Sequence, residues 1–595
     1  MKHTTTFLLL LLCNACMQVV FSQSKITAAI KQSPATVILT DGTISTDITV
    51  QRKWSGNFCT TTLHNNGKEV TSIKEVVMIN IGHVFNSNTS LYAEGFQMLS
   101  QYRGTLASPK LVGGYDDNGH YKLAQPKGYK AVYNMLVLHL SGGNELLMGF
   151  NSSFRFIGKF YLSADTVKVV TDMGNILLQP GASVQLEEFS LLQGKTVDEL
   201  TARFAERINH FHPRLKTKTE PAGWCSWYCF GPDVTAKNIT DHLAYIRKNI
   251  PQLKYIQLDD GYQPHMGDWL ETGNYFGGSI KAVLKEITAA GFEPAIWVAP
   301  FICDSNSSIF KAHRDWLVKD TSGNPLRSDK VTFGGWRLAP WYALDATNPA
   351  VQQHLTNVFK TMSKEWGVTY FKLDANFWGA LPGGVYYDKN ATRVSAYRSG
   401  MKAVLKGAGD AFILGCNHPL WPSLGLINGS RSSNDISREW ETFKVTGEEN
   451  LLRAWQNGKL WWNDPDCILL TGTLSENEYQ YHASLLFATG GMMLSGDDLT
   501  TISAARLATL KKLLPAKGVP ALFNNTLDVG WMKRPDGLYL ILLNKNEESK
   551  KIDVSLPATY QFTNYFTDEK KGTFKNNFIE ELPAHSGRVY KLMAL

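Results

Sequence analysis

From about residue 25 to residue 212, short runs of β-branched and aromatic residues alternate with polar residues, and Gly and Asn clusters separate the runs. The clearest runs are 35–40, 132–138 and 166–170. This alternation is typical of strands that bury one face. We therefore predict an antiparallel β-sandwich over residues 24–213. The polar segment 212–221, which contains two prolines, is the expected boundary that follows it.

After residue 221 short apolar strands alternate with helical stretches, a rhythm that favours parallel strands joined by crossover helices. In the clearest helix, Asn348 can cap the start, Pro349 suits the first turn and Gly367 marks the end. About eight such units over roughly 300 residues predict a (β/α)8 TIM barrel, which we place at 214–515. A doubly wound sheet is the alternative, but the glycine-rich phosphate loop that usually accompanies it is absent from the sequence. The strands are expected at 222–227, 255–258, 294–298, 370–373 and 411–415, and near 426–427, 460–462 and 491–494.

From about residue 516 the helical patterns stop. Residues 538–543 and 586–592 have the composition of strands, which predicts a small all-β domain over 516–595. The predicted fold class is therefore multidomain, with a central TIM barrel between an N-terminal antiparallel β-sandwich and a C-terminal β domain. A length of 595 residues suits more than one domain.

Residues 1–23 are predicted to be a signal peptide. Lys2 precedes a short apolar run at 7–12, and small residues such as Ala15 follow it. That run is too short to cross a bilayer, and no later apolar run reaches about 18 residues, so we expect no membrane span. We expect an exported protein, periplasmic or extracellular after cleavage. Cys16 would suit a lipid anchor, but Cys13 stands where such a signal prefers an aliphatic residue.

Cysteine content and charge exclude several classes of protein. Of eight cysteines, six follow the predicted signal peptide, too few for a disulfide framework, so we expect free, buried thiols. After the predicted signal peptide the sequence has neither a Cys-x-x-Cys pair nor a His-Glu-x-x-His motif, and we expect no metal and no cofactor. The formal charge is +7, but the basic residues are scattered, so no nucleic-acid partner is expected.

Acidic residues follow four of the expected barrel strands, where the acting residues of such barrels lie. Each one alone also fits a capping or solvated side chain, but four around one rim suit polyol binding or acid–base chemistry. Lys372 and Asp374 are two residues apart on a strand, so both face one side and the lysine would hold the aspartate ionised. A purely structural ion pair is the alternative there. The acids are Asp259 and Asp260, Asp374, Asp435, and Asp464 with Asp466.

Five motifs in chain order resemble the α-galactosidases of glycoside hydrolase family 36 and their relatives in family 27. Four are Trp-Cys-Ser-Trp at 224–227, Leu-Asp-Asp-Gly at 258–261, Phe-Lys-Leu-Asp at 371–374 and Trp-Asn-Asp-Pro-Asp at 462–466. The fifth is Arg431 followed by Asp435. The resemblance covers about half the chain. Asn417 and His418 depart from it, because small residues are expected after Cys416.

The resemblance implies a retaining exo-α-galactosidase that removes terminal α-linked galactose from an oligosaccharide or polysaccharide by double displacement. It makes Asp374 the nucleophile and Asp435 the general acid/base. An α-N-acetylgalactosaminidase, a transglycosylase and a non-catalytic carbohydrate-binding protein remain alternatives, and the oligomeric state stays open. The implied substrate-binding residues are Asp259 and Asp260 at the O4 and O6 hydroxyls, Lys372 and Arg431 at other hydroxyls, Trp227 and Trp297 as aromatic walls, Cys416 near O2, and Asp466 less directly.

Overall fold

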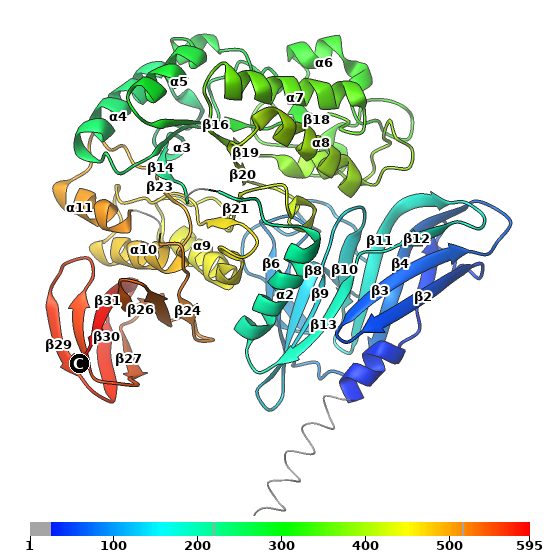
Figure 1. Cartoon of the computed structure of the whole chain (residues 1–595), viewed down its shortest axis with the longest axis horizontal. Helices are drawn as coiled ribbons and strands as arrows, with labels where there is room; N and C mark the ends of the chain where they lie inside the picture. Colours follow the sequence, from blue (N-terminus) through cyan, green and yellow to red (C-terminus); the bar gives the residue numbers. More distant parts are fainter. Residues whose placement is uncertain (1–24, 218–219, 515–516) are drawn as a thin grey trace, which may run out of the picture.

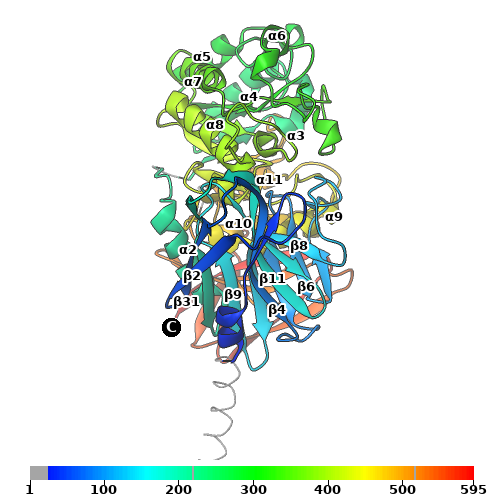
Figure 2. The same ribbon diagram turned by 90° about the vertical axis from the view of Figure 1, so that its right-hand side faces the viewer.

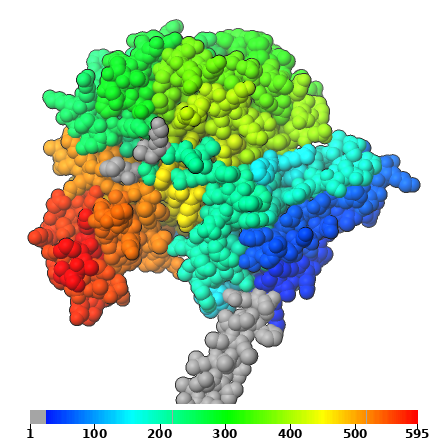
Figure 3. Space-filling model, in the orientation of Figure 1, coloured from blue at the N-terminus to red at the C-terminus, as the bar shows by residue number. Residues whose placement is uncertain are grey.

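The computed structural model describes residues 25–217, 220–514 and 517–595, so the expected signal peptide at 1–23 lies outside the described residues. Figure 1 shows a central part rich in helices, with strands of the N-terminal part (blue to cyan) and of the C-terminal part (red) packed against it. The view turned by 90° and the space-filling view show the same arrangement (Figures 2 and 3).

The N-terminal strands are antiparallel, as predicted, but they form one hydrogen-bonded network of 13 strands in place of two separate sheets. The network encloses an apolar core of its own, which includes Val132, Leu136 and Met148. Side chains of the opposite face, such as Met135, join the core of the barrel. The strands are β1 (Thr36–Leu39), β2 (Ile48–Ser55), β3 (Phe58–Asn65), β4 (Thr71–Gly82), β5 (Ser90–Glu94), β6 (Gln101–Thr105), β7 (Ser108–Leu111), β8 (Lys130–Leu140), β9 (Asn144–Phe150), β10 (Ile157–Leu162), β11 (Thr166–Leu178), β12 (Ser183–Gln185) and β13 (Phe189–Gly194).

Two helices of this region differ from the sequence prediction, and the first of them spans residues 25–32. Residues Val197–Phe211 form a helix, α2, where only strands were expected. The Thr196 side chain caps its start by accepting from the Glu199 backbone, and Leu200, Phe204 and Ile208 are buried along one face. This spacing of three and four residues is the helical period that the strand interpretation overlooked.

The central sheet confirms the eight parallel strands. The first seven barrel strands pair in chain order, in the sequence β14, β15, β16, β19, β20, β21 and β22, and β23 pairs with β14, so the barrel is nearly closed. Between β22 and β23, the Met492 backbone N–H donates to the Asn463 carbonyl at 2.8 Å. The strands are β14 (Ala222–Cys225), β15 (Tyr255–Leu258), β16 (Glu293–Val298), β19 (Tyr370–Leu373), β20 (Phe412–Gly415), β21 (Gly429–Arg431), β22 (Trp462–Asp464) and β23 (Met493–Ser495).

The helices between these strands cover the barrel. Helix α7 begins at Pro349 with Asn348 as its cap, as predicted, and ends at Lys364, three residues before the expected stop. Trp227 begins helix α3 and does not extend β14. The helices are α3 (Trp227–Phe230), α4 (Ala236–Asn249), α5 (Ile280–Ala289), α6 (Ser308–Ala312), α7 (Pro349–Lys364), α8 (Arg393–Ala408), α9 (Trp440–Leu452), α10 (Glu476–Thr489) and α11 (Ala504–Leu513), and β17 (Ile302–Cys303) pairs with β18 (Tyr342–Ala343) in an excursion after β16.

The C-terminal part is all β, as predicted. A six-stranded antiparallel sheet and a two-stranded sheet enclose a small core that includes Leu540, Phe562 and Phe578. Helix α10 of the barrel packs against β26 and β31. The strands are β24 (Leu522–Phe523), β25 (Val529–Arg534), β26 (Gly537–Asn544), β27 (Lys550–Ser555), β28 (Tyr560–Asn564), β29 (Lys570–Phe574), β30 (Asn577–Leu582) and β31 (Ser586–Ala594).

A buried ion pair joins the N-terminal strands to the barrel. Arg453 Nη2 lies 2.6 Å from Glu94 Oε2, and neither side chain is more than 1% exposed. The same guanidinium also donates to the Ser100 carbonyl of the N-terminal part and to the Ser432 carbonyl of the barrel. Because Ser432 lies just past β21, this contact also supports the loop that follows that strand.

Candidate active site

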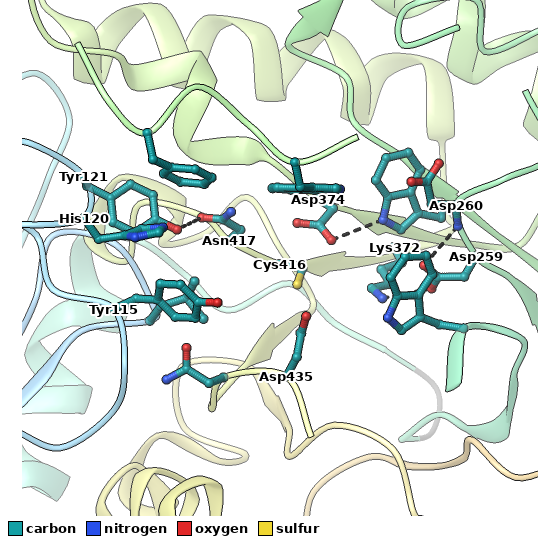
Figure 4. Close-up of a pocket in the computed structure, with 16 residues that line it drawn as sticks. Tyr115, His120, Tyr121, Asp259, Asp260, Lys372, Asp374, Cys416, Asn417 and Asp435 are labelled. Atoms are coloured by element: carbon teal, nitrogen blue, oxygen red, sulfur yellow. Dashed lines mark hydrogen bonds and ion pairs between the residues drawn. The ribbon is translucent and has the colours of Figure 1, made fainter. Parts of the chain in front are cut away.

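A cavity of about 320 Å³ opens at the carboxyl ends of the barrel strands, where the sequence predicted a site. Eight of the ten predicted residues line it (Figure 4). The other two, Arg431 and Asp466, lie behind the wall. The eight are Trp227, Asp259, Asp260, Trp297, Lys372, Asp374, Cys416 and Asp435.

Asp374 directly follows β19 and is held by two donors. Trp297 Nε1 donates to its Oδ2 at 3.2 Å, and the Ala375 backbone N–H donates to Oδ1 at 2.6 Å. Ala375 has a φ of 51°, a left-handed conformation that is uncommon for alanine. This strained turn lets the backbone N–H of Ala375 reach the carboxylate before it.

Lys372 faces the cavity as predicted, but its ion pair is with another acid. Its Nζ lies 2.8 Å from Asp259 Oδ2, across from β19 to the end of β15. Gln257 Nε2 donates to the same oxygen at 2.8 Å. The direct ion pair of Lys372 is therefore with Asp259, because its side chain crosses the barrel axis, although its charge still acts to lower the pKa of Asp374, as expected.

Asp435 stands four residues past β21 and is held from behind by Arg431. Arg431 Nη2 lies 2.7 Å from Asp435 Oδ1 and 2.6 Å from Asp466 Oδ2. The Tyr228 hydroxyl also donates to Asp466 Oδ2. Arg431 and Asp466 are buried, whereas the Asp435 side chain is 71% exposed to the cavity. Arg431 and Asp466 therefore position Asp435 in this structure.

The two carboxylates that face the cavity differ in proton affinity. Burial raises the pKa of Asp374 above its usual value, and the nearby charge of Asp435 adds to the increase, while Lys372 opposes it. Burial also acts to raise the pKa of Asp435, but Arg431 and Lys372 outweigh it and leave that pKa below its usual value. In the empty cavity the proton therefore prefers Asp374, the reverse of the expectation from sequence.

This difference predicts the stability of an Asp374→Asn variant. A raised pKa contributes stability that is present below the ordinary value of 3.8 and is lost as the pH rises through the folded-state pKa. We expect Asp374→Asn to unfold at a higher urea concentration than the wild type at pH 7, and at the same concentration near pH 4. Urea midpoints at both pH values measure this.

Asp172 is the matched control for that prediction. It lies 2.8 Å from Lys159 Nζ, and although burial acts to raise its pKa, the charge of Lys159 lowers it overall. Its contribution to stability is therefore present above its unfolded pKa and lost as the pH falls. Asp172→Asn should destabilise the protein at pH 7, and an Asp374→Asn variant that behaves in the same way would contradict the raised pKa of Asp374.

Arg337 was not foreseen from the sequence. It donates through Nε to Asp260 Oδ2 at 3.1 Å and through Nη2 to Asp260 Oδ1, a bidentate pair. Gln263 Nε2 donates to Asp260 Oδ1 at 2.7 Å. Trp336, the neighbour of Arg337, lines the cavity and is 41% exposed. The excursion after β16 thus supplies both an aromatic wall and the partner of a predicted substrate-binding acid.

The N-terminal part of the chain also reaches the cavity. Four of its residues line the cavity, and Figure 4 shows three of them, Tyr115, His120 and Tyr121, opposite the Asp259 end. The Tyr121 hydroxyl donates to Asn417 Oδ1 at 2.7 Å. No motif marked these residues, and only a cluster of aromatic residues could have drawn attention to them. The four are Leu99, Tyr115, His120 and Tyr121, and the other unforeseen lining residues are Phe333, Trp336, Asn417 and Asn434.

Three further observations concern the described part of the chain. The six cysteines in it are free and mostly buried, as predicted. No cluster of three or more His, Cys, Asp or Glu side chains in residues 25–217, 220–514 and 517–595 is arranged to hold a metal ion. Within the same ranges, no helix has the length and apolar character needed to cross a membrane.

The family model described as Melibiase matches residues 187–407, which hold β14 to β19 and Asp374. This chain therefore carries a Melibiase domain in its central part. The Melibiase match includes Asp259, Asp260, Lys372 and Asp374. The resemblance stated from the five sequence motifs is thereby confirmed.

Curated relatives are distant and match only in part. The myogenesis-regulating glycosidase of Mus musculus is 24% identical over 161 residues, which are 27% of this chain and 22% of that protein. The α-galactosidase AgaA of Geobacillus stearothermophilus is 23% identical over 212 residues, 34% of this chain and 27% of that protein. The chain thus matches only about a quarter of the length of these two relatives.

Solved structures show the likeness of the whole fold. The α-galactosidase of Thermus thermophilus, in complex with p-nitrophenyl α-D-galactopyranoside, has a TM-score of 0.60 at 21% identity, and the match covers 81% of this chain and 97% of that one. The family 36 α-galactosidase AgaA of Geobacillus stearothermophilus has a TM-score of 0.63 at 12% identity, covering 94% and 89%. The barrel with its flanking β domains is therefore the fold of these enzymes.

Proposed function

We propose that this protein is a retaining exo-α-galactosidase that releases terminal α-linked galactose from oligosaccharides or polysaccharides. One observation carries the proposal: Asp374 and Asp435, from the ends of β19 and β21, face the same sugar-sized cavity from different sides (Figure 4). Such a pair of carboxylates is what double displacement at an anomeric carbon requires. The galactoside complexes among the structural neighbours support the choice of sugar.

In the first proposed step an Asp374 oxygen attacks the anomeric carbon as the bond to the leaving oxygen breaks. Asp435 gives its proton to that leaving oxygen, and a β-linked glycosyl–enzyme forms. In the second step Asp435 takes a proton from water, the water oxygen attacks the anomeric carbon, and Asp374 leaves as a carboxylate. Two inversions at one carbon retain the α configuration.

The proposed cycle needs Asp374 ionised and Asp435 protonated, whereas the empty cavity favours the reverse. A bound glycoside changes both environments. It covers the Asp435 side chain, which is 71% exposed in the empty cavity, and loss of water from a carboxylate raises its pKa. The positive charge that develops at the anomeric carbon favours an ionised Asp374. Substrate binding therefore moves the proton to the residue that must donate it.

Recognition of the sugar is assigned to the acids at the end of β15. Asp259 and Asp260 are both 2% exposed and both line the cavity. Lys372 forms an ion pair with Asp259 and Arg337 with Asp260, and these contacts hold both carboxylates in place. Two fixed acceptors bind a sugar more tightly when its hydroxyls point toward them. A sugar whose hydroxyls point elsewhere leaves both carboxylates without hydrogen-bond partners and binds more weakly. In the proposal these are the O4 and O6 hydroxyls of galactose.

A panel of 4-nitrophenyl α-glycosides tests the proposal. We expect the α-galactoside to be hydrolysed, and the α-glucoside to react about ten- to a hundredfold more slowly in kcat/KM, because one hydrogen bond to a buried charge is lost. Nuclear magnetic resonance of the first product should show α-galactose. Preference for the α-N-acetylgalactosaminide would replace the proposed activity with that alternative. Binding of galactose without turnover of any glycoside would indicate a carbohydrate-binding protein.

A further inference from the structure

Tyr121 brings the N-terminal part of the chain into contact with the residue that follows Cys416. Its hydroxyl donates to Asn417 Oδ1 at 2.7 Å, and both residues line the cavity (Figure 4). Tyr121 is 0% exposed and Asn417 is 6% exposed. The contact is therefore shielded from bulk water, and a lost hydrogen bond there is not replaced easily.

The backbone of Asn417 is fixed on both sides. Asn417 has a φ of 43°, and its carbonyl accepts from the Phe377 backbone N–H at 2.8 Å. The carbonyl of the next residue, His418, accepts from the Met98 backbone N–H of the N-terminal part at 2.9 Å. Because the backbone cannot adjust, the orientation of the Asn417 side-chain amide depends on its own contacts.

Tyr121 has a fixed ring that can impose that orientation. Its ring packs edge-on against Phe377, with centroids 4.6 Å apart, and against Phe333 at 5.5 Å. An amide has one acceptor oxygen and one NH2 donor group. When Tyr121 occupies the oxygen, the NH2 group turns away from it toward the cavity, as Figure 4 shows. A hydroxyl oxygen of a bound sugar is an acceptor for that group.

We infer that Asn417 Nδ2 donates a hydrogen bond to a hydroxyl of the bound galactoside and that Tyr121 is the positioning residue that sets the amide in this orientation. The inference rests on the proposed function and extends it, because it makes the N-terminal part of the chain a determinant of sugar affinity. It also gives a role to Asn417, one of the two residues that depart from the family pattern after Cys416.

The test compares kcat and KM on 4-nitrophenyl α-galactoside for the full-length wild type, Tyr121→Phe, Asn417→Ala and the double variant. We expect Tyr121→Phe to raise KM about three- to tenfold, the worth of one neutral hydrogen bond, with kcat within about twofold. In the Asn417→Ala background, Tyr121→Phe should add nothing, because Tyr121 acts through Asn417. Asn417→Asp keeps an acceptor for Tyr121 but loses the donor, so it should behave like Asn417→Ala.

Tyr133→Phe is the matched control, since Tyr133 is a buried tyrosine in β8 of the N-terminal part and does not line the cavity. It should leave KM unchanged, and all variants should melt within a few degrees of the wild type. Binding of the monodeoxy analogues of galactose, measured by calorimetry, identifies the hydroxyl. The analogue that lacks the hydroxyl bound by Asn417 should have the same affinity for the wild type and for Asn417→Ala.

An unchanged KM for Tyr121→Phe overturns the inference, and so does an equal effect of this substitution with and without Asn417. Either result leaves the α-galactosidase proposal intact when the wild type still hydrolyses the substrate. If the wild type hydrolyses no glycoside, calorimetry with galactose on the same four proteins decides the inference. Absence of galactose binding by the wild type would overturn both the inference and the proposed function.

Discussion

Asp374→Ala is expected to lower kcat on 4-nitrophenyl α-galactoside by a factor on the order of 10⁴ to 10⁶, because removal of a nucleophile eliminates the covalent route. The carboxylate that β19 presents is held by Trp297 and by the Ala375 backbone, so no neighbouring acid can take its place. Initial rates from the release of nitrophenol measure the loss. Turnover within tenfold of the wild type would remove Asp374 from the proposed mechanism.

External azide distinguishes the roles of the two acids. In Asp374→Ala, azide attacks the substrate directly and should give β-galactosyl azide. In Asp435→Ala, the glycosyl–enzyme still forms from an activated aryl glycoside, and azide then displaces Asp374 to give α-galactosyl azide. Nuclear magnetic resonance separates the two products. The opposite pair of anomers would mean that the roles of Asp374 and Asp435 are exchanged.

Asp268 is the matched control for the loss of Asp374. Burial raises the pKa of the Asp268 carboxyl as it raises that of Asp374. Asp268 lines a separate cavity of about 300 Å³ with Trp316 and His354, so Asp268→Ala should retain most of the turnover. A similar loss in both variants would point to general misfolding of the barrel.

Arg453→Met should destabilise the protein by about 3–5 kcal/mol, since it leaves a buried carboxylate without its counter-ion. The partner, Glu94, is 0% exposed and belongs to β5 of the N-terminal sheet. Urea denaturation at pH 7 measures the loss. Activity should fall as well, because Arg453 Nη1 donates to the Ser432 carbonyl at 3.2 Å in the loop that carries Asp435.

Arg103→Met is the matched control at the same interface. Arg103 Nη1 lies 2.8 Å from Glu448 Oε1, but the two side chains are 37% and 23% exposed, so this pair should contribute at most about 1 kcal/mol. The double variant Glu94→Gln with Arg453→Met should recover part of the loss, because no buried charge then lacks a partner. Equal losses for Arg103→Met and Arg453→Met would show that burial does not set the cost.

Much of the fold followed from local patterns. The strands 255–258 and 370–373 were predicted at their observed bounds, and helix α7 begins at the predicted Pro349. These elements can be predicted from the sequence because apolar runs, caps and helical spacing are properties of neighbouring residues. Strand β21 was expected at 426–427 and lies at Gly429–Arg431, since three residues give too short a pattern to place.

The sequence by itself determined that a parallel barrel is present and which strand ends carry acids, because order along the chain and periodicity specify both. Only the tertiary structure decided how those acids are paired. Lys372 meets Asp259 across 113 residues of sequence, and Tyr121 meets Asn417 across 296. Such contacts depend on how separate elements pack. Residues that meet in this way have no characteristic separation along the sequence, so the sequence pattern does not predict the pair.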